Sequence, residues 1–249
     1  MFYGADQAGI HHERFGGLAA GAAGDLLDAL AAAGHTRGTV VDLGCGSGIL
    51  ARAVTDAGYD VVGVDLSVDM VDLARRNAPA ATFEVGSIHD VELPDGCVGV
   101  TAIGEVLNYG TDERSGFEAV GRLAARVHDA LAPGGIFLTD LSGPGRAGPT
   151  GIVKQFHRDD VWCLGMIAME SAEKRRLDRE ITIFVAEPDG RYRRVDEHHV
   201  VHLYDRGEVE ARLVAEGFEV EVADGYRTPT SHPNVLPGWY VVRATKSIT

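Results

Sequence analysis

Cysteine is scarce in this sequence. Three of the 249 residues are cysteines, Cys45, Cys97 and Cys163, and no two of them have the CxxC spacing of a metal site. Their odd number and wide separation argue against a disulfide framework or a zinc site. A chain of this length buries roughly 70–75% of its unfolded surface, so it needs no such cross-links.

Long apolar runs and basic residues are also few. No stretch approaches the ~20 apolar residues that span a bilayer, and the opening MFYGADQAG lacks the basic start and apolar core of a signal peptide. The 23 Lys and Arg stand against 37 Asp and Glu, for a formal net charge of −14. Such a surface repels nucleic-acid phosphates and anionic lipids. We therefore expect a cytoplasmic protein whose partner is neither nucleic acid nor membrane.

Strand and helix patterns alternate through the first 141 residues. An Ala-rich, Leu-spaced run up to Ala33 predicts one helix, and an amphipathic helix is expected over 114–131. Short apolar runs predict strands at 39–43, 60–66, 81–85, 98–104 and 136–141. This alternation is typical of an α/β fold, a parallel sheet with helices on both faces.

The pattern changes after residue 141. From about 152 to 204 it has period two, which predicts three or four antiparallel strands. A helix and two strands then follow. We expect a helical cover over 1–37, a core over 38–141, an antiparallel β insertion over 142–205, and a return to the core over 206–249. The insertion could form a lid over the site, a homodimer surface, or both.

A glycine turn lies between the first predicted strand and its helix, in VVDLGCGSGIL. Such a turn binds a nucleotide-like ligand, because glycines allow close approach and the helix N-terminus offers free N–H groups. Ile49 stands where the dinucleotide fingerprint GxGxxG has its last glycine, and the P-loop pattern is missing. Asp65 ends the second predicted strand, where its carboxylate can accept both hydroxyls of a ribose.

Five segments in order resemble the motifs of class I S-adenosylmethionine-dependent methyltransferases: VVDLGCGSG, VVGVDLS, FEVGSIHDVELPDG, AIGEVLNY and LAPGGIFLTD. The resemblance covers about 38–141 and again 206–245. It implies a Rossmann-like seven-stranded sheet whose last strand is antiparallel. It also implies direct in-line transfer of a methyl group, S-adenosyl-L-methionine as cofactor, S-adenosyl-L-homocysteine as product, and no metal.

The resemblance assigns one group of residues to the methionine end of the cofactor. Gly44, Cys45 and Gly46 would face its methionine and ribose portions. Asp42 would help to hold the turn and the methionine amino group, and Gly104 would offer that group its carbonyl.

A second group is assigned to the nucleoside end. Asp65 would bind the ribose hydroxyls, and Leu66 and Met70 would pack on the adenine. Many members have an acid followed by a small or apolar residue after the third strand, where this chain has Ser87 and Ile88. Ser87 could replace the acid in part, and Ile88 would cover the ring.

The acceptor is expected to be a small molecule, methylated at oxygen or nitrogen. The segment GEVLNYG lacks the prolines of the [DNS]PPY motif found in base methyltransferases. The length and placement of the insertion resemble natural-product methyltransferases that act on amino sugars and carry a β lid at this point.

The histidine-rich stretch DEHHVVHLY supplies catalytic candidates. If it is a strand, one face carries His202 and Tyr204 and could line a pocket, while the face with His199 would turn to the core. A histidine base suits neutral pH, although a solvated surface strand explains the same pattern. Glu105 follows Gly104 and could face cofactor or substrate. Further candidates for substrate contact are Tyr3, His11, His12, Asn108 and Tyr109.

Two other classes of function remain open from the sequence. A nicotinamide-dependent oxidoreductase could use a similar sheet, and a non-catalytic protein could bind S-adenosylmethionine without turnover. The break at Ile49 argues against the first.

Overall fold

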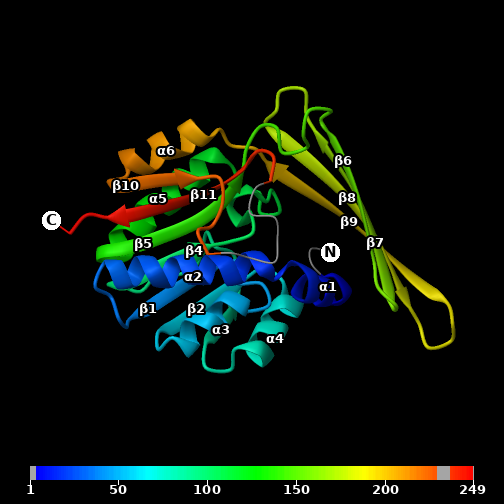
Figure 1. The fold of residues 1–249 in the computed structure, drawn as a ribbon, viewed down its shortest axis with the longest axis horizontal. Helices are drawn as coiled ribbons and strands as arrows, with labels where there is room; N and C mark the ends of the chain where they lie inside the picture. The colour runs from blue at the N-terminus through cyan, green and yellow to red at the C-terminus, as the bar shows by residue number, and fades with distance from the viewer. Residues whose placement is uncertain (1–3, 229–235, 249) are drawn as a thin grey trace.

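The computed structural model describes residues 4–228 and 236–248 and contains two β-sheets (Figure 1). The larger sheet contains seven strands: β1 (Thr39–Leu43), β2 (Asp60–Asp65), β3 (Thr82–Val85), β4 (Cys97–Ala102), β5 (Leu131–Ser142), β10 (Phe218–Ala223) and β11 (Trp239–Lys246). Their order is β10-β11-β5-β4-β1-β2-β3. Only the pairs made by β11 are antiparallel within this described sheet. The predicted Rossmann-like sheet with an antiparallel last strand is confirmed.

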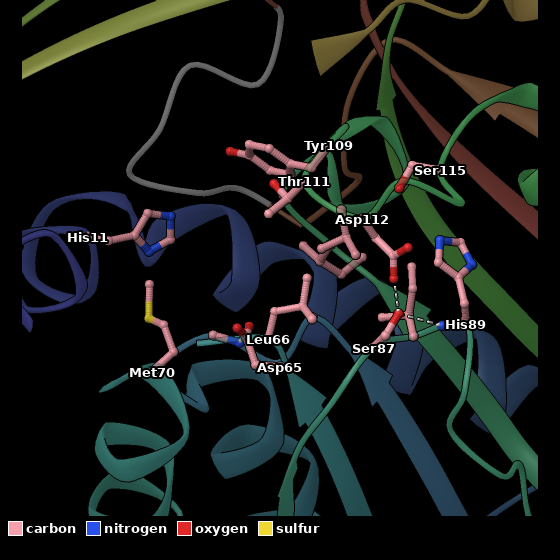
Figure 2. Close-up of a pocket in the computed structure, with 16 residues that line it drawn as sticks. His11, Asp65, Leu66, Met70, Ser87, His89, Tyr109, Thr111, Asp112 and Ser115 are labelled. Carbon is pink, nitrogen blue, oxygen red and sulfur yellow. Dashed lines mark hydrogen bonds between the residues drawn. The ribbon is translucent and has the colours of Figure 1, made fainter. Parts of the chain in front are cut away.

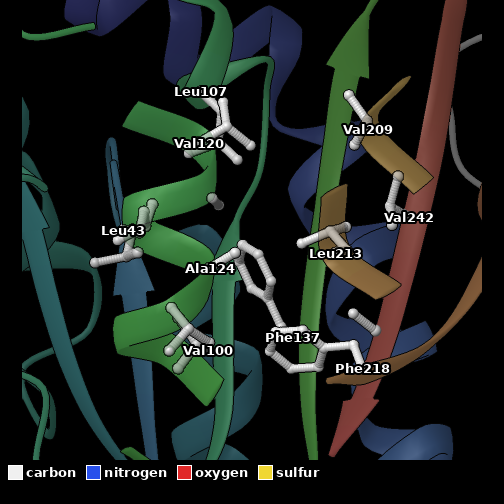
Figure 3. Packing of buried hydrophobic residues seen from close by; sticks show 14 of the residues in the cluster. Leu43, Val100, Leu107, Val120, Ala124, Phe137, Val209, Leu213, Phe218 and Val242 are labelled. Atoms are coloured by element: carbon white, nitrogen blue, oxygen red, sulfur yellow. The ribbon is translucent and has the colours of Figure 1, made fainter. Parts of the chain in front are cut away.

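Helices cover both faces of this sheet, as the alternating pattern predicts. One face carries α2 (Gly17–Ala32), α3 (Ile49–Asp56) and α4 (Val68–Asn77), and the other carries α5 (Phe117–Ala130) and α6 (Arg206–Ala215). On the second face Val120 and Ala124 of α5, and Leu213 of α6, pack over Phe137 of β5 (Figure 3). Each helix buries one apolar stripe and leaves its polar stripe in water.

The Ala-rich run forms α2, as predicted, and a further helix that was not predicted precedes it. Helix α1 (Ala5–Phe15) ends at Gly16, and α2 begins directly after it at an angle. Gly16 packs on the Ile49 side chain so closely that a Cβ there would lie 2.3 Å from its Cδ1. Within the described ranges no single helix has the length and apolar character of a membrane span, and these two reach it only together, across a bend of 54°.

The second sheet is the predicted antiparallel insertion, and we call it the lid. It comprises β6 (Ile152–Arg158), β7 (Trp162–Glu170), β8 (Arg176–Ala186) and β9 (Tyr192–His202), in that order. In Figure 1 it lies beside the large sheet, near α1. Ile10 of α1 packs against Trp162, Leu164 and other apolar side chains of the lid. The lid therefore rests on the N-terminal helix as well as on the core.

The outer face of the lid carries exposed apolar side chains. Phe156 is 68% exposed, and Ile167 and Phe184 are also exposed on the same face of the sheet. Such a face suits contact with another surface. The homodimer expected through the insertion stays a prediction.

Two neighbouring residues of α6 test this packing. Leu213 is 1% exposed beneath the helix, while Val214 is 54% exposed on its outer side. Leu213→Ala removes buried methyl groups and leaves a cavity, so we expect it to lower the free energy of unfolding by about 2–5 kcal/mol. Val214→Ala should change it by less than about 0.5 kcal/mol. Urea unfolding of both variants measures the difference, and equal losses would contradict this placement of α6.

Candidate active site

A cavity opens at the carboxyl edge of the large sheet (Figure 2). This position is that of small-molecule sites in open α/β sheets. The lining comes from α1, the glycine turn, the loops after β2, β3 and β4, and α4: His11, Gly44, Gly46, Asp65, Leu66, Met70, Ser87, Ile88, His89, Ile103, Gly104, Val106, Tyr109, Thr111, Asp112 and Ser115. Ten of these sixteen were expected from the sequence.

The glycine turn leaves room for a ligand at the floor of the cavity. Gly44 and Gly46 have φ angles of 69° and 50°, in the left-handed region that favours glycine. A Cβ on Gly44 would lie 2.4 Å from Val106, so that position cannot hold a larger residue without movement. A Cβ on Gly46 would meet nothing within 4 Å. Gly46 thus borders open space that a ligand can fill.

Asp65 shapes the turn and faces the cavity. Its Oδ2 accepts a hydrogen bond from the Gly46 amide at 2.9 Å, and its Oδ1 accepts one from the Ser67 amide at 2.8 Å. Burial raises the pKa of Asp65, and these two bonds work in the opposite direction. Each carboxylate oxygen has a second lone pair, so both can still accept from ligand hydroxyls.

The walls next to Asp65 are apolar. Leu66, Met70 and Ile88 line the cavity, and Leu66 stays 43% exposed although it is a large apolar residue. In Figure 2 Leu66 and Met70 lie on the same side of the cavity as Asp65, opposite Tyr109 and Thr111. An exposed leucine facing a cavity suits a flat apolar ring.

A carboxylate approaches Ser87, where the family's acid is missing. The Ser87 hydroxyl donates to Asp112 Oδ2 at 2.6 Å, and the His89 amide donates to the Ser87 oxygen at 3.2 Å. Arg114 binds Asp112 through its backbone amide and its guanidinium, which lowers the pKa of that carboxyl far below its ordinary value. Asp112 was not predicted from the sequence, although the absent acid at position 87 was a signal that another residue supplies the charge.

The end of β4 is held by a buried carboxylate of β5. Asp140 accepts hydrogen bonds from the backbone amides of Gly104, at 2.9 Å, and Glu105, at 2.6 Å, and from the Tyr226 hydroxyl at 2.6 Å. Glu105 has a φ of 63°, which is rare for a residue other than glycine. These bonds hold the backbone in that conformation.

Glu105 does not face the space where cofactor or substrate is expected from the sequence. It does not line the cavity; its side chain is buried and receives hydrogen bonds from Arg179, Arg146 and the Ser142 hydroxyl. Burial alone would raise the pKa of Glu105, but the two arginines and the hydroxyl lower it far below its ordinary value. A carboxylate held so strongly in its charged form is a poor proton acceptor. This geometry contradicts the catalytic assignment.

His202 and Tyr204 also lie outside the lining of this cavity, where their face of the strand could have been expected. Tyr204 is buried in the core, and its hydroxyl donates to the Leu107 carbonyl at 3.4 Å. The opposite face of β9, with Glu197 and His199, is the one buried against the core. The alternation along the strand and the inward turn of the His199 face are both as expected from the sequence.

Three other expected residues, Asp42, Cys45 and Asn108, are buried next to the site and do not line the cavity. Asp42 is buried and accepts a hydrogen bond from the Thr101 hydroxyl at 2.7 Å; burial raises its pKa to about 7. Cys45 is buried within the turn, and burial raises the pKa of its thiol. Asn108 donates to the backbone carbonyl of Ser142 at 2.8 Å, which gives it a structural role.

Of the remaining candidates for substrate contact, some line the cavity and others do not. His11 and Tyr109 line the cavity. His12 instead pairs with the Ser47 hydroxyl, Nδ1 to Oγ 2.9 Å, and so attaches α1 to the glycine turn. Tyr3 lies outside the described residues. Over residues 4–228 and 236–248 no group of three or more His, Cys, Asp or Glu side chains could hold a metal ion, and a metal-free reaction stays a prediction.

Comparison with known proteins agrees with this geometry. Residues 40–135 match a family model described as a methyltransferase domain. A Streptomyces venezuelae protein described as dTDP-3-amino-3,4,6-trideoxy-alpha-D-glucopyranose N,N-dimethyltransferase is 24% identical over 204 residues, 82% of this chain and 84% of its own. The dTDP-3-amino-3,6-dideoxy-alpha-D-glucopyranose N,N-dimethyltransferase of Streptomyces fradiae is 25% identical over 213 residues, 80% of this chain and 77% of its own.

Solved structures show the same fold. An S-adenosylmethionine-dependent methyltransferase from Clostridium acetobutylicum has a TM-score of 0.79 at 16% identity and covers 97% of this chain and 98% of its own. A SAM-bound amino pentose methyltransferase from Micromonospora echinaspora has a TM-score of 0.73 at 19% identity, over 99% and 98%.

These matches and the cavity decide between the classes of function left open. The nicotinamide-dependent oxidoreductase and the non-catalytic binding protein are set aside, because the core of the chain matches a methyltransferase domain and its relatives are methyltransferases. Residues 40–135 match a methyltransferase domain, the fold is that of S-adenosylmethionine-dependent methyltransferases, and these findings support S-adenosylmethionine as the cofactor.

Proposed function

We propose that this enzyme methylates the amino group of a small amino sugar carried on a nucleotide. The observation that carries the proposal is the match over most of this chain to the two sugar N,N-dimethyltransferases, and the state of the two carboxylates that line the cavity agrees with it. Asp65 is bound to backbone amides, and Asp112 is bound to Arg114 and Ser87. Neither is placed to deprotonate a hydroxyl, whereas an uncharged amine attacks with its own lone pair. Two relatives over most of this chain are described as N,N-dimethyltransferases of dTDP-amino sugars.

The cavity offers a fitting place for the nucleoside half of the cofactor. We assign the ribose hydroxyls to Asp65 and the adenine ring to the space between Leu66 and Ile88. The pair Ser87 and Asp112 supplies the negative end of a hydrogen bond from the adenine amino group. The uncovered space beside Gly46 supports this assignment, since a Cβ there would project into it.

The methionine half then points toward the end of β4. We assign its amino group to the Gly104 carbonyl and to the region of Asp42, as the family resemblance implies. The acceptor would enter between α1 and the lid, where His11 and Tyr109 reach the cavity.

The protein supplies no reacting group in the chemical step. When bound, S-adenosylmethionine supplies a methyl group on a positively charged sulfur. The acceptor nitrogen forms a bond to the methyl carbon as the carbon–sulfur bond breaks, and the ammonium product loses its proton to solvent. The enzyme has to align the nitrogen with that bond and exclude water. His11 and Tyr109 are the residues we assign to acceptor orientation.

The acceptor assignment is tested with a matched pair of nucleotide sugars, one with an amino group and one with a hydroxyl at the same carbon. We expect methylated product from the amine only, detected by mass spectrometry together with S-adenosylhomocysteine. The rate should be the same with EDTA, since no metal takes part. Methylation of the hydroxyl sugar alone would contradict the proposal, and loss of activity with EDTA would contradict a metal-free reaction.

The ribose assignment is tested at the two ends of β2. Asp65→Ala removes the acceptor of the ribose hydroxyls, so the dissociation constant for S-adenosylhomocysteine should rise by about tenfold or more, or about 1.4 kcal/mol. Asp60 begins the same strand and is exposed, so Asp60→Ala is the matched control with unchanged affinity. Calorimetric titration measures both. Equal affinity of Asp65→Ala and the unaltered enzyme would remove the assignment.

Asp42 should make cofactor affinity depend on pH. Burial raises its pKa to about 7, and the ammonium group of the ligand should favour its charged form. Below that pH, binding has to displace a proton from Asp42. Affinity for S-adenosylhomocysteine should therefore rise by up to roughly tenfold between about pH 6 and pH 8. Asp42→Asn removes the titrating group and should flatten the profile; an equally steep profile in the variant would assign the effect elsewhere.

A further inference from the structure

A buried arginine of the lid, Arg179, contacts the cavity-lining residue Tyr109. The reaction proposed above gives this arginine no role. Arg179 lies on the inner face of β8, and its Nη2 donates to Glu105 Oε2 at 2.5 Å. Its Nη1 donates to the Tyr109 hydroxyl at 3.4 Å. One planar guanidinium therefore bridges Glu105 and the hydroxyl of a cavity-lining tyrosine, a geometry that a lysine cannot reproduce.

The lid also holds the backbone and ring of Tyr109. Its backbone forms a β-bridge with Val201, and the next amide, of Gly110, donates to the Val200 carbonyl at 2.8 Å. The Tyr109 ring meets His199 edge to face, with ring centroids 5.7 Å apart. The direction in which the phenol points into the cavity is thus set by β8 and β9.

The cofactor side of the same loop is held without the lid. The amides of Gly104 and Glu105 donate to Asp140, which belongs to the large sheet. A change in the lid can therefore move Tyr109 while Gly104 keeps its place. Cofactor binding and acceptor orientation depend on different supports.

We propose that Arg179 is a positioning residue for methyl transfer, which fixes the Tyr109 hydroxyl at the acceptor end of the cavity while Glu105 holds the guanidinium. This inference rests on the proposed function, because it needs an acceptor bound beside Tyr109. The lid then determines acceptor geometry through Tyr109.

Arg179→Lys keeps the positive charge beside Glu105 but cannot span both partners. We expect kcat/KM for the acceptor to fall by about tenfold or more, because a small misplacement of an orienting group costs rate. The dissociation constant for S-adenosylhomocysteine should stay within about threefold, which also shows that the variant is folded. Arg176, exposed on the same strand and paired with Asp178, gives the control Arg176→Lys with unchanged kinetics. Equal kinetics of Arg179→Lys and the unaltered enzyme would overturn the proposal.

A double-mutant cycle separates positioning from general stability. If Arg179 acts through the phenol, Tyr109→Phe combined with Arg179→Lys should be no slower than the slower single variant. A merely structural arginine would give losses in kcat/KM that multiply. Multiplied losses would overturn the proposal.

The rate of amide hydrogen exchange tests the role of Arg179 without a measurement of turnover. In Arg179→Lys the Gly110 amide should exchange faster than in the unaltered protein, because Tyr109 is held less firmly against β9. Unchanged exchange would contradict the role of Arg179 in holding this loop. An unaltered enzyme that methylates no amine would instead count against the proposed function, so the two failures are distinguishable.

Discussion

The buried carboxylate of Glu105, a residue with a left-handed backbone conformation, links the two sheets of this protein through ion pairs. Glu105 follows the last residues of β4 and binds Arg146 from the loop before the lid and Arg179 from the lid itself. Burying a charge in this way is tolerated only when its partners are in place. Glu105 therefore joins the lid and the loop that leads into it to the chain that follows β4, while Asp140 of the large sheet holds the backbone there.

The residues on the two sides of the cavity are held by different parts of the structure. The large sheet places the glycine turn, Asp65 and Gly104 at neighbouring strand ends, because parallel strands bring their carboxyl ends to one edge. The lid and α1 bring Tyr109 and His11 to the opposite side. In our proposal the cofactor binds at this edge, while the acceptor meets His11 of α1 and Tyr109 of the loop after β4, which the lid holds.

Local signals explain what could be predicted from the sequence. Strand periodicity, the glycine spacing and Asp65 act within a few residues, so the sheet and most of the cavity lining beside Asp65 were predictable. Asp112 was missed because its contact with Ser87 spans 25 residues of chain and depends on the fold of an irregular loop. The two faces of β9 were separated correctly, and the face with His199 is the buried one, as expected. Whether the other face, with His202, lines the cavity depends on how the whole lid packs, and it lies outside the lining. Glu105 was misread because its arginine partners are 41 and 74 residues away.

The account depends on where the cofactor lies relative to Asp65 and Tyr109. A crystal structure of the protein with S-adenosylhomocysteine tests this most directly. It should show the ribose hydroxyls on the Asp65 carboxylate, the adenine between Leu66 and Ile88, and the sulfur facing the side of the cavity that carries Tyr109. A ligand whose ribose lies away from Asp65, or whose sulfur points away from Tyr109 and the lid, would contradict the account.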